Sequence, residues 1–597
     1  MPVDFLQDNL KAEECPVSAD PNVGVIMKKS VTGYLILIFL AGFFTAANAD
    51  PLPQIAHQPT EDQAVSLPAG TGFIPPNLDF SHLGVIRPDV SFKPAVLPER
   101  FDWRESGGVS SVKNQSSCGA CYSFATLANI EGNLMINGEG EFDFSENNIK
   151  ECEFYESSCS GGNYLRMANF LSQAGTVLES CDPYEASDVA CNSGCEYQKT
   201  LLGWIQFSGA IVPNADDLKN FLYTHGPVYT SLYVGDSYNT TWQSEFYAYD
   251  GSYVLATTAS GASNHAVTIV GWDDTLSYSG GQGAWIVKNS WGQYWGGTCD
   301  YGSEGGYFYI AYGDVGIGGW VSTISDYQDY ESTETLYYYD EAGMRNALGY
   351  SDPECWAMAK FTPVADDFLS RVEFWTTDAV VDLDIYVYDN FNGSSLSNLL
   401  ASQENLSYDY SGYYSVELDN PFQLATGNSV YVVVKFENLS YGYPLAVDDT
   451  LTSETNDCWM SPNGSSWQEM GSMTIGFRTG FDPGIRMRTT PTLSAGADDD
   501  NDQPLYYYEL QQNYPNPFNP TTTIFYNLAQ REAVTLKVYN LIGQEVTTLV
   551  NGIQEAGPHQ IDWDGCDSNG KSVASGIYFY RVETENYTQT RKMVFLK

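Results

Sequence analysis

The sequence predicts a multidomain protein in which one α+β domain is followed by two all-β modules. Its 597 residues exceed what one hydrophobic core organises, because domains usually span about 100 to 200 residues. Between residues 98 and 325 a helical pattern of apolar side chains comes first and strand-like runs come later, which is typical of an α+β layout. After residue 334 the apolar segments are short and separated by turn residues, which indicates β modules.

The first 97 residues divide into three predicted parts. Residues 27–49 join a basic start, Met27-Lys28-Lys29, to a short apolar run and the small residues Ala47-Asn48-Ala49, as in a secretory signal peptide. A membrane anchor is the alternative, but the run is shorter than the ~20 residues that span a bilayer. Residues 1–26 are interpreted as an upstream extension, and the proline-rich residues 50–97 as a short pro-segment or linker. We therefore expect a secreted or cell-surface protein.

The composition narrows the classes of partner. The formal charge is −48, from 75 acidic and 27 basic residues. Such a surface repels phosphate backbones, so nucleic acid is not an expected partner. Aromatic residues make up 14% of the chain, which indicates folded domains over most of its length because disordered chains lack them.

The α+β region contains the motif Cys118-Gly119-Ala120-Cys121-Tyr122 just before a helical pattern that continues to Met135. A cysteine in the first turn of a helix meets unpaired backbone N–H groups and the positive end of the helix dipole, and both favour the thiolate, the nucleophilic form. A disulfide between Cys118 and Cys121 is the structural alternative. Among the five histidines, His265 alone opens a predicted strand.

The motif fits the C-G-[SA]-C-[WY] signature of papain and the cathepsins, and residues 98–325 resemble a papain-like cysteine peptidase domain. Further matching motifs follow in the family's order: Leu97-Pro98-Glu99-Arg100-Phe101-Asp102-Trp103-Arg104, Phe144-Ser145-Glu146-Asn147-Asn148, Cys159-Ser160-Gly161-Gly162, Asn264-His265-Ala266-Val267 and Lys288-Asn289-Ser290-Trp291-Gly292. Tyr122 stands where the family usually has Trp. Residues 50–97 are too few for the long helical inhibitory segment of many relatives.

The resemblance implies a role for each matching residue. Cys121 would be the nucleophile, His265 the acid and base, and Asn289 the residue that orients the imidazole. Gln115 and the backbone N–H of Cys121 would form the oxyanion hole, and Trp291 would shield the His265–Asn289 pair from water. The separation of His265 from Cys121 fits the family's spacing. Gly161 and Gly162 are candidate substrate-binding residues.

The remaining cysteines are candidates for disulfides, because export leads to an oxidising compartment. The resemblance pairs Cys118 with Cys159 and Cys152 with Cys191, proximity pairs Cys181 with Cys195, and a Cys355–Cys458 bridge is expected in the next domain. Zinc binding is disfavoured because, apart from the Cys118–Cys121 motif, only Cys191 and Cys195 are close enough to resemble a zinc-site pair, and no histidine lies near them. We therefore expect neither a metal nor a cofactor.

The two predicted β modules after the peptidase-like domain indicate where the protein acts. Residues 334–490 resemble the lectin-like sandwich found beside such peptidase domains in some bacterial proteins, which implies a carbohydrate or cell-surface ligand. Residues 491–510 are interpreted as an acidic linker. Residues 511–597, with Asn513-Tyr514-Pro515-Asn516-Pro517-Phe518-Asn519-Pro520 and Gly576-Ile577-Tyr578-Phe579-Tyr580, resemble the FlgD-like sorting domain of type IX secretion, which implies contact with secretion machinery.

Two functions follow as hypotheses. The first is a secreted endopeptidase that cuts protein or peptide substrates through a Cys121 thioester acyl-enzyme, with His265 as acid and base. The second is a catalytically inactive surface or glycan-binding protein built on the same scaffold. The complete set of Gln115, Cys121, His265 and Asn289 favours the first.

Overall fold

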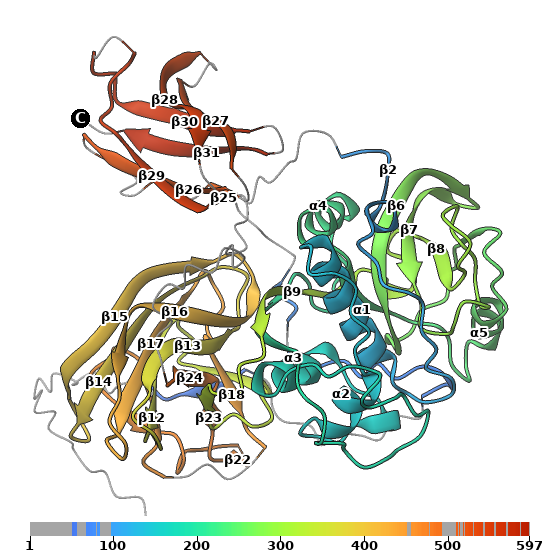
Figure 1. The fold of residues 1–597 in the computed structure, drawn as a ribbon, viewed down its shortest axis with the longest axis horizontal. Coiled ribbons are helices and arrows are strands. Elements are labelled where there is room, and N and C mark those ends of the chain that lie inside the picture. The colour runs from blue at the N-terminus through green and yellow to red at the C-terminus, as the bar shows by residue number, and fades with distance from the viewer. Residues whose placement is uncertain are drawn as a thin grey trace, which may run out of the picture. The chain divides into compact units, whose positions relative to one another are not determined.

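The computed structural model describes residues 51–56, 67–78, 80–83, 97–450, 455–476, 478–491, 509–510, 513, 518, 520–528, 531–540, 544–554, 557–568, 571–584 and 587–595. The predicted upstream extension, the predicted signal peptide and most of the predicted acidic linker lie outside these residues. Within them, a helix-containing domain is followed by β modules (Figure 1), so the predicted fold class is confirmed.

The peptidase-like domain contains five α-helices and a set of mostly antiparallel strands. The helices are α1 (Cys121–Ile136), α2 (Glu146–Cys152), α3 (Tyr164–Gln173), α4 (Ala215–His225) and α5 (Thr240–Tyr247). The strands are β2 (Arg100–Asp102), β3 (Lys199–Gln206), β4 (Val228–Leu232), β5 (Val254–Leu255), β6 (His265–Tyr278), β7 (Gly281–Lys288), β8 (Tyr307–Ala311) and β9 (Gly319–Asp329).

Helix α1 is the central element of this domain. Both its apolar and its polar side chains are buried from Cys121 to Leu134, with Ala128 the exception, because the helix lies between β6 on one side and α2 and α3 on the other. A helix that is buried on all sides needs no amphipathic pattern. Its N-cap, Ala120, makes no side-chain capping bond, so the first-turn N–H groups stay available to the thiol of Cys121.

The lectin-like region is an antiparallel sandwich. Its strands are β10 (Thr335–Tyr337), β11 (Asn346–Gly349), β12 (Glu354–Phe361), β13 (Phe368–Thr376), β14 (Val381–Phe391), β15 (Leu396–Tyr408), β16 (Ser411–Gln423), β17 (Val430–Asn438), β18 (Leu445–Asp448), β19 (Cys458–Ser461), β20 (Gln468–Glu469), β21 (Thr474–Ile475), β22 (Arg478–Thr479), β23 (Asp482–Pro483) and β24 (Ile485–Thr490). Alternate residues of β12, β14 and β17 point into a core shared with β13 and β24, as period-two strands require.

The two domains share one sheet. Strand β16 pairs with β3, so the lectin-like strands β10, β24, β13 and β16 continue into the strands of the peptidase-like domain. A buried arginine reinforces the join: Arg486 Nη2 lies 2.8 Å from Asp340 Oδ2 within the lectin-like region, and Arg486 Nη1 donates across the join to Ser172 Oγ of α3 at 2.8 Å. Backbone pairing and a satisfied buried charge fix the orientation of one domain against the other.

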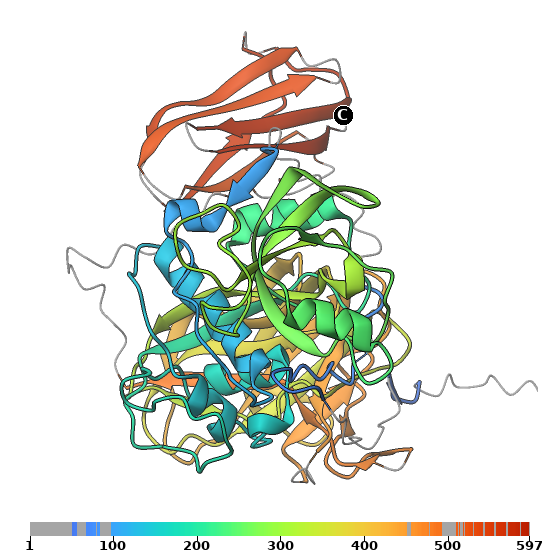
Figure 2. The same ribbon diagram turned by 90° about the vertical axis from the view of Figure 1, so that its right-hand side faces the viewer.

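The N-terminal segment does not form a domain of its own. Strand β1 (Gln54–Ile55) pairs antiparallel with β11 of the lectin-like domain, and in Figure 1 this blue strand lies among the yellow and orange strands. Residues 67–78 then cross the peptidase-like domain. Figure 2 shows this dark-blue segment passing between teal helices and green strands.

The C-terminal module has its own core. Its strands are β25 (Glu509–Leu510), β26 (Thr522–Leu528), β27 (Glu532–Asn540), β28 (Glu545–Gln554), β29 (Gly557–Trp563), β30 (Gly576–Glu583) and β31 (Thr588–Phe595), in two antiparallel sheets. Trp563, Tyr580 and Phe595 pack between the sheets. Among the residues that the structure describes, no helix has the length and apolar character of a membrane span.

Three disulfides link the cysteine-rich part of the first domain: Cys118–Cys159, Cys152–Cys191 and Cys181–Cys195. These are the three pairs expected there from the sequence. The expected Cys355–Cys458 bridge is wrong, because both are buried free cysteines. Cys458 lies opposite Ala359, four residues along β12 from Cys355, or about 13 Å at ~3.3 Å per residue. A disulfide requires Cα atoms within about 7 Å.

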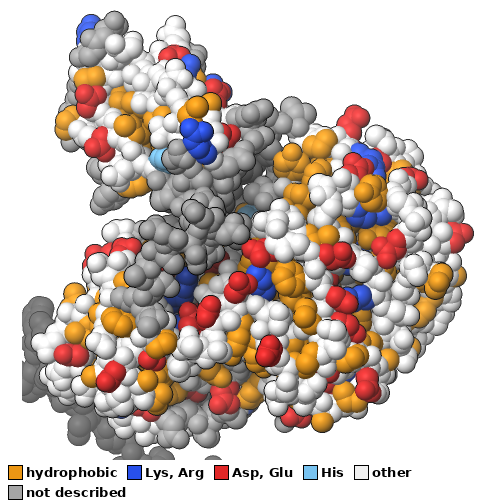
Figure 3. Space-filling model, in the orientation of Figure 1, with side chains coloured by type: hydrophobic (Ala, Val, Ile, Leu, Met, Phe, Trp, Pro, Cys, Tyr) orange, Lys and Arg blue, Asp and Glu red, His pale blue; other side chains and the backbone are white. Residues whose placement is uncertain are grey.

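The surface reflects the composition. Figure 3 shows carboxylate side chains scattered over the visible face, with few basic groups between them.

Candidate active site

The site is assembled around the thiol of Cys121 at the N-terminus of α1. Cys121 is buried, and the backbone N–H of Ala266 donates to its Sγ at 3.2 Å. Burial raises the pKa of the thiol to about 12, although backbone N–H groups of Ala266, Tyr122, Cys121 and Phe73 act in the opposite direction. In the covered site the thiol is therefore protonated at neutral pH. The backbone N–H of Phe73 lies close to the Cys121 sulfur.

His265 and Asn289 come together because β6 pairs with β7. Thr268 lies opposite Lys288 in this pair, so the start of β6 and the end of β7 lie side by side. His265 Nε2 lies 2.8 Å from Asn289 Oδ1, which makes Nε2 the protonated nitrogen and leaves Nδ1 as an acceptor. His265 Nδ1 has no hydrogen-bond partner within the described structure. Burial lowers the pKa of His265 to about 4, although the bond to Asn289 acts in the opposite direction.

Gln115 lies beside the start of α1. Its Nε2 donates to the carbonyl oxygen of Cys118 at 2.9 Å, and its backbone N–H donates to Ser290 O at 2.8 Å. The hydroxyl of Ser290 also donates to Gln115 Oε1. Because an amide nitrogen carries two hydrogens, this fixed side chain keeps one donor for an oxygen that develops negative charge near Cys121.

Trp291 covers the His265 ring. The ring centroids are 5.1 Å apart, and Phe246 of α5 packs edge-on against Trp291 at 5.4 Å. This aromatic cover excludes water from the His265–Asn289 hydrogen bond and so strengthens it.

The blocking segment, residues 67–78, passes directly over this site. Gly162 N donates to Gly72 O and Ile74 N donates to Gly162 O, each at 2.9 Å. On the other side of the thiol, Trp291 Nε1 donates to Gly70 O at 2.7 Å. The candidate residue Gly162 therefore binds an extended chain through its backbone, and Gly161 allows the turn beside it with φ of 101°.

Phe73 of the blocking segment fills an aromatic pocket next to the thiol. Its ring centroid lies 6.4 Å from that of Tyr229 and 6.3 Å from that of Trp320. Trp320 adopts a φ of 56°, a strained conformation for a bulky residue. The geometry of this pocket therefore depends on a backbone conformation that the tertiary structure must hold.

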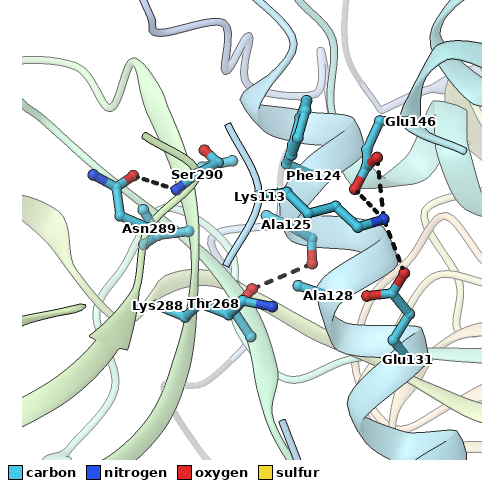
Figure 4. A pocket seen from close by; sticks show the side chains of 12 residues that line it. Lys113, Phe124, Ala125, Ala128, Glu131, Glu146, Thr268, Lys288, Asn289 and Ser290 are labelled. Carbon is cyan, nitrogen blue, oxygen red and sulfur yellow. Dashed lines mark hydrogen bonds and ion pairs between the residues drawn. The ribbon is translucent and has the colours of Figure 1, made fainter. Parts of the chain in front are cut away.

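A cluster of buried charges lies behind the site, in the pocket drawn in Figure 4. Lys113 Nζ bridges Glu131 Oε1 at 3.2 Å and Glu146 Oε1 at 3.1 Å, and Ser110 Oγ donates to Glu131 Oε2 at 2.6 Å. Burial lowers the pKa of Lys288 to about 8, with Glu131 acting in the opposite direction.

This cluster supports the end of the strand that carries Asn289. Asn289 and Ser290 line the same pocket as Lys288 and Glu131, and Lys288 Nζ donates to Ser110 Oγ at 3.0 Å. The charge network therefore fixes the end of β7, from which Asn289 projects.

Sequence reasoning placed Cys121, His265, Asn289, Gln115 and Trp291, and the structure brings all five together. It missed Ser290, Phe246, Phe73 and the Phe73 pocket. Ser290 stands inside the quoted Lys288-Asn289-Ser290-Trp291-Gly292 motif, so its position was a usable signal. The other contacts join segments distant in sequence and left no local pattern. The described residues contain no group of three or more His, Cys, Asp or Glu residues that could hold a metal ion.

Comparisons with known families agree with this geometry. Residues 97–325 match the model of the papain family of cysteine proteases, residues 336–477 a lectin-like domain, and residues 519–587 the FlgD Ig-like domain. The first part of the chain is thus a papain-family peptidase domain, followed by a lectin-like and a FlgD Ig-like domain.

Individual relatives share the peptidase part. A cathepsin L-like proteinase of Fasciola hepatica is 35% identical over 206 residues, which cover 34% of this chain and 58% of the relative. Human cathepsin O is 32% identical over 204 residues, which cover 34% of this chain and 59% of the relative. The chain thus spans less than two thirds of these relatives.

A solved structure shares the domain arrangement. The cysteine protease and lectin-like domains of Cwp84, a surface layer associated protein of Clostridium difficile, align with a TM-score of 0.55 and 20% identity, covering 69% of this chain and 94% of that one. A second Cwp84 structure, of a variant of the protease after propeptide cleavage, gives a TM-score of 0.55 at 21% identity, covering 66% of this chain and 99% of that one. This likeness establishes the fold of both domains together.

Proposed function

We propose that this protein is a secreted cysteine endopeptidase that is produced as an inactive precursor. The observation that carries the proposal is the 2.8 Å contact between His265 Nε2 and Asn289 Oδ1, on a strand whose next residue, Ala266, donates to the Cys121 thiol. This arrangement leaves Nδ1 as the acceptor for the thiol proton, as nucleophilic catalysis by cysteine requires.

The reaction follows from these positions. Cys121 Sγ transfers its proton to His265 Nδ1 and attacks the scissile carbonyl carbon. The carbonyl oxygen becomes an oxyanion that the Cys121 backbone N–H and Gln115 Nε2 stabilise. His265 then protonates the leaving amine, and the C–N bond breaks to give a thioester on Cys121. Water, deprotonated by His265, hydrolyses the thioester and restores the thiol.

The path of the blocking segment supports cleavage within chains. It contacts Trp291 on one side of the thiol and Gly162 on the other, so the cleft accepts a polypeptide that continues in both directions. An exopeptidase needs one of these directions closed.

The blocking segment also supports the proposal that the protein is produced as an inactive precursor. Residues 50–97 act as a pro-segment that covers the nucleophile, and activity requires its removal. Burial beneath it holds both Cys121 and His265 in their neutral forms, through a raised thiol pKa and a lowered imidazole pKa. Uncovering the site restores solvent to both groups and favours the thiolate–imidazolium pair.

Location and partners are proposed from the other domains. Residues 27–49 direct export, the FlgD Ig-like domain serves as the sorting signal toward the secretion machinery, and the lectin-like domain binds a carbohydrate or another cell-surface ligand. The aromatic rings of Trp356 and Tyr386 stack at 5.9 Å on the sheet face opposite the main core. A Cβ at Gly464 would lie 3.0 Å from the Trp356 ring, so a loop packs against this ring.

The test is cleavage of unfolded casein by the chain freed of residues 50–96, under reducing conditions, with Cys121→Ala as the paired variant. We expect cleavage at internal bonds and its loss in Cys121→Ala. Equal cleavage by the variant contradicts the mechanism, and no cleavage by either form favours the inactive surface-binding alternative.

A further inference from the structure

The blocking segment is held at both ends by the lectin-like domain. The first contact, the strand anchor, is formed by residues 54–56. Gln54 pairs with Gly349 and Ile55 with Leu348 in an antiparallel ladder, and Ala56 N donates to Ala347 O at 2.9 Å. The N-terminal segment thus adds a strand to the free edge of β11, which is the mode by which extended peptides bind exposed sheet edges.

The strand anchor is also a side-chain contact. Ile55 is 8% exposed and belongs to the core of the lectin-like domain, beside Leu348 and Leu445. Leu52, three residues earlier, is 79% exposed. Ile55 therefore fills a space in the core of the lectin-like domain, whereas the exposed Leu52 contributes nothing to that core.

The second contact, the ring anchor, is formed by residues 80–83 just after the blocking segment. The His82 ring stacks on Tyr441 with centroids 3.9 Å apart, and His82 Nε2 lies 2.8 Å from Thr377 O. Leu83 is fully buried, and Phe80 packs edge-on against Trp320. Trp320 also contacts Phe73, so the ring anchor and the Phe73 pocket share a wall.

The blocking segment also has contacts of its own within the cleft. Its backbone hydrogen-bonds to the backbone of Gly162 and Asn264, it accepts side-chain hydrogen bonds from Trp291, Asn163 and Tyr247, and it buries one large side chain, Phe73. Tethering both ends to the same rigid unit keeps the segment at a high effective concentration over the cleft. A short segment can in this way block the site without a folded inhibitory domain of its own.

We propose that the lectin-like domain binds the chain's own N-terminal segment at the strand anchor and the ring anchor and thereby keeps the peptidase latent. The latency part rests on the proposed function, whereas the binding part does not. The lectin-like domain is then in two states. Before processing it holds the pro-segment, and after processing the edge of β11 and the core space that Ile55 had filled are exposed.

The experiment uses the chain from residue 50 to residue 597 and measures how fast iodoacetamide alkylates Cys121, by mass spectrometry of the Cys121 peptide. Ile55→Asp breaks the strand anchor, and Leu52→Asp is the charge-matched control. We expect alkylation at least tenfold faster in Ile55→Asp and within twofold of the parent in Leu52→Asp. His82→Ala is expected to act in the same direction as Ile55→Asp. Parent-like alkylation in both anchor variants overturns the proposal.

A second measurement separates local release from unfolding. Hydrogen exchange of the Cys121→Ala chain, with and without Ile55→Asp, reports on the amides of Phe73 and Ile74. We expect faster exchange there and unchanged exchange in α1. Unchanged exchange at Phe73 and Ile74 overturns the proposal, and so does faster exchange throughout α1, because the strand anchor would then support the fold and not the segment. Both readouts need no peptidase activity, so a failure of the proposed function leaves this test intact.

Discussion

The backbone N–H of Gly162 donates to the carbonyl oxygen of Gly72 at 2.9 Å, and the carbonyl of Gly162 accepts from Ile74 at the same distance. One glycine of the peptidase domain thus pairs with the blocking segment as a strand would, next to the nucleophile. The approach is so close that a Cβ built on Gly72 would lie 1.9 Å from Gly119 O.

Gly72→Val therefore expels the blocking segment, since the clash is with backbone that cannot turn away. We expect Cys121 to react with iodoacetamide at least tenfold faster in this variant of the precursor. Pro75→Ala, at an exposed position of the same segment, is the control and keeps the parent rate. A parent rate in Gly72→Val contradicts the observed path of the segment.

Asn289→Ala removes the acceptor of the His265 Nε2–H. The imidazole then loses its fixed tautomer and orientation, and we expect kcat of the processed enzyme to fall by about 10² to 10⁴-fold with KM nearly unchanged, because Asn289 contacts His265 and not the substrate path. Steady-state kinetics on a fluorogenic peptide measures both constants. Asn428→Ala, in an exposed loop of the lectin-like domain, keeps the parent values, and a change in KM alone is the result that contradicts this role.

The pH dependence of precursor stability follows from His265, whose pKa burial lowers to about 4. The ordinary value is about 6.5, so the unfolded state binds the extra proton first, and stability is lost as pH falls from about 6.5 to 4. The full effect is about 3 kcal/mol. Urea unfolding at pH 6.5 and pH 4 measures it, and His265→Gln is expected to lose about 3 kcal/mol less across this range. An equal loss in both chains shows that His265 is not the titrating group.

Glu131→Gln tests the buried charge cluster. Glu131 accepts from Lys113 Nζ at 3.2 Å, Ser110 Oγ at 2.6 Å and the Phe144 N–H at 3.0 Å, so its loss leaves a buried ammonium without one carboxylate. We expect the free energy of unfolding to fall by about 3 kcal/mol, measured by urea titration. Glu245→Gln, on the exposed side of α5, is expected to change it by less than ~0.5 kcal/mol.

Cys355 and Cys458 are expected to carry free thiols in the purified protein. Alkylation in denaturant without reductant labels both, whereas Cys118 and Cys159 are labelled only after reduction. Peptide mapping by mass spectrometry distinguishes the states. A linked Cys355–Cys458 peptide contradicts the pairing of β12 with β19.

Most residues of the candidate site could be predicted from short patterns in the sequence. The Cys118 to Tyr122 motif, the strand that begins at His265 and the Asn289 motif are each readable within a few residues, because backbone turns and helix starts constrain neighbours along the chain. The Cys355–Cys458 prediction failed for the opposite reason. Two Cys-Trp pairs look equivalent in sequence, but register decides whether they meet, and register depends on how β12, β17 and β19 pair.

The sequence by itself determined the class of chemistry, the order of the domains and the candidate catalytic residues, since these depend on residue types at fixed local spacing. Only the tertiary structure decided the state of the site. A proline-rich segment without apolar periodicity showed no sign of what it binds, because Gly72 and Ile74 hydrogen-bond to residues far along the chain and Ile55 packs into the core of another domain. Long-range contacts of this kind cost chain entropy and leave no local signal, and here they cover the nucleophile that the sequence had identified.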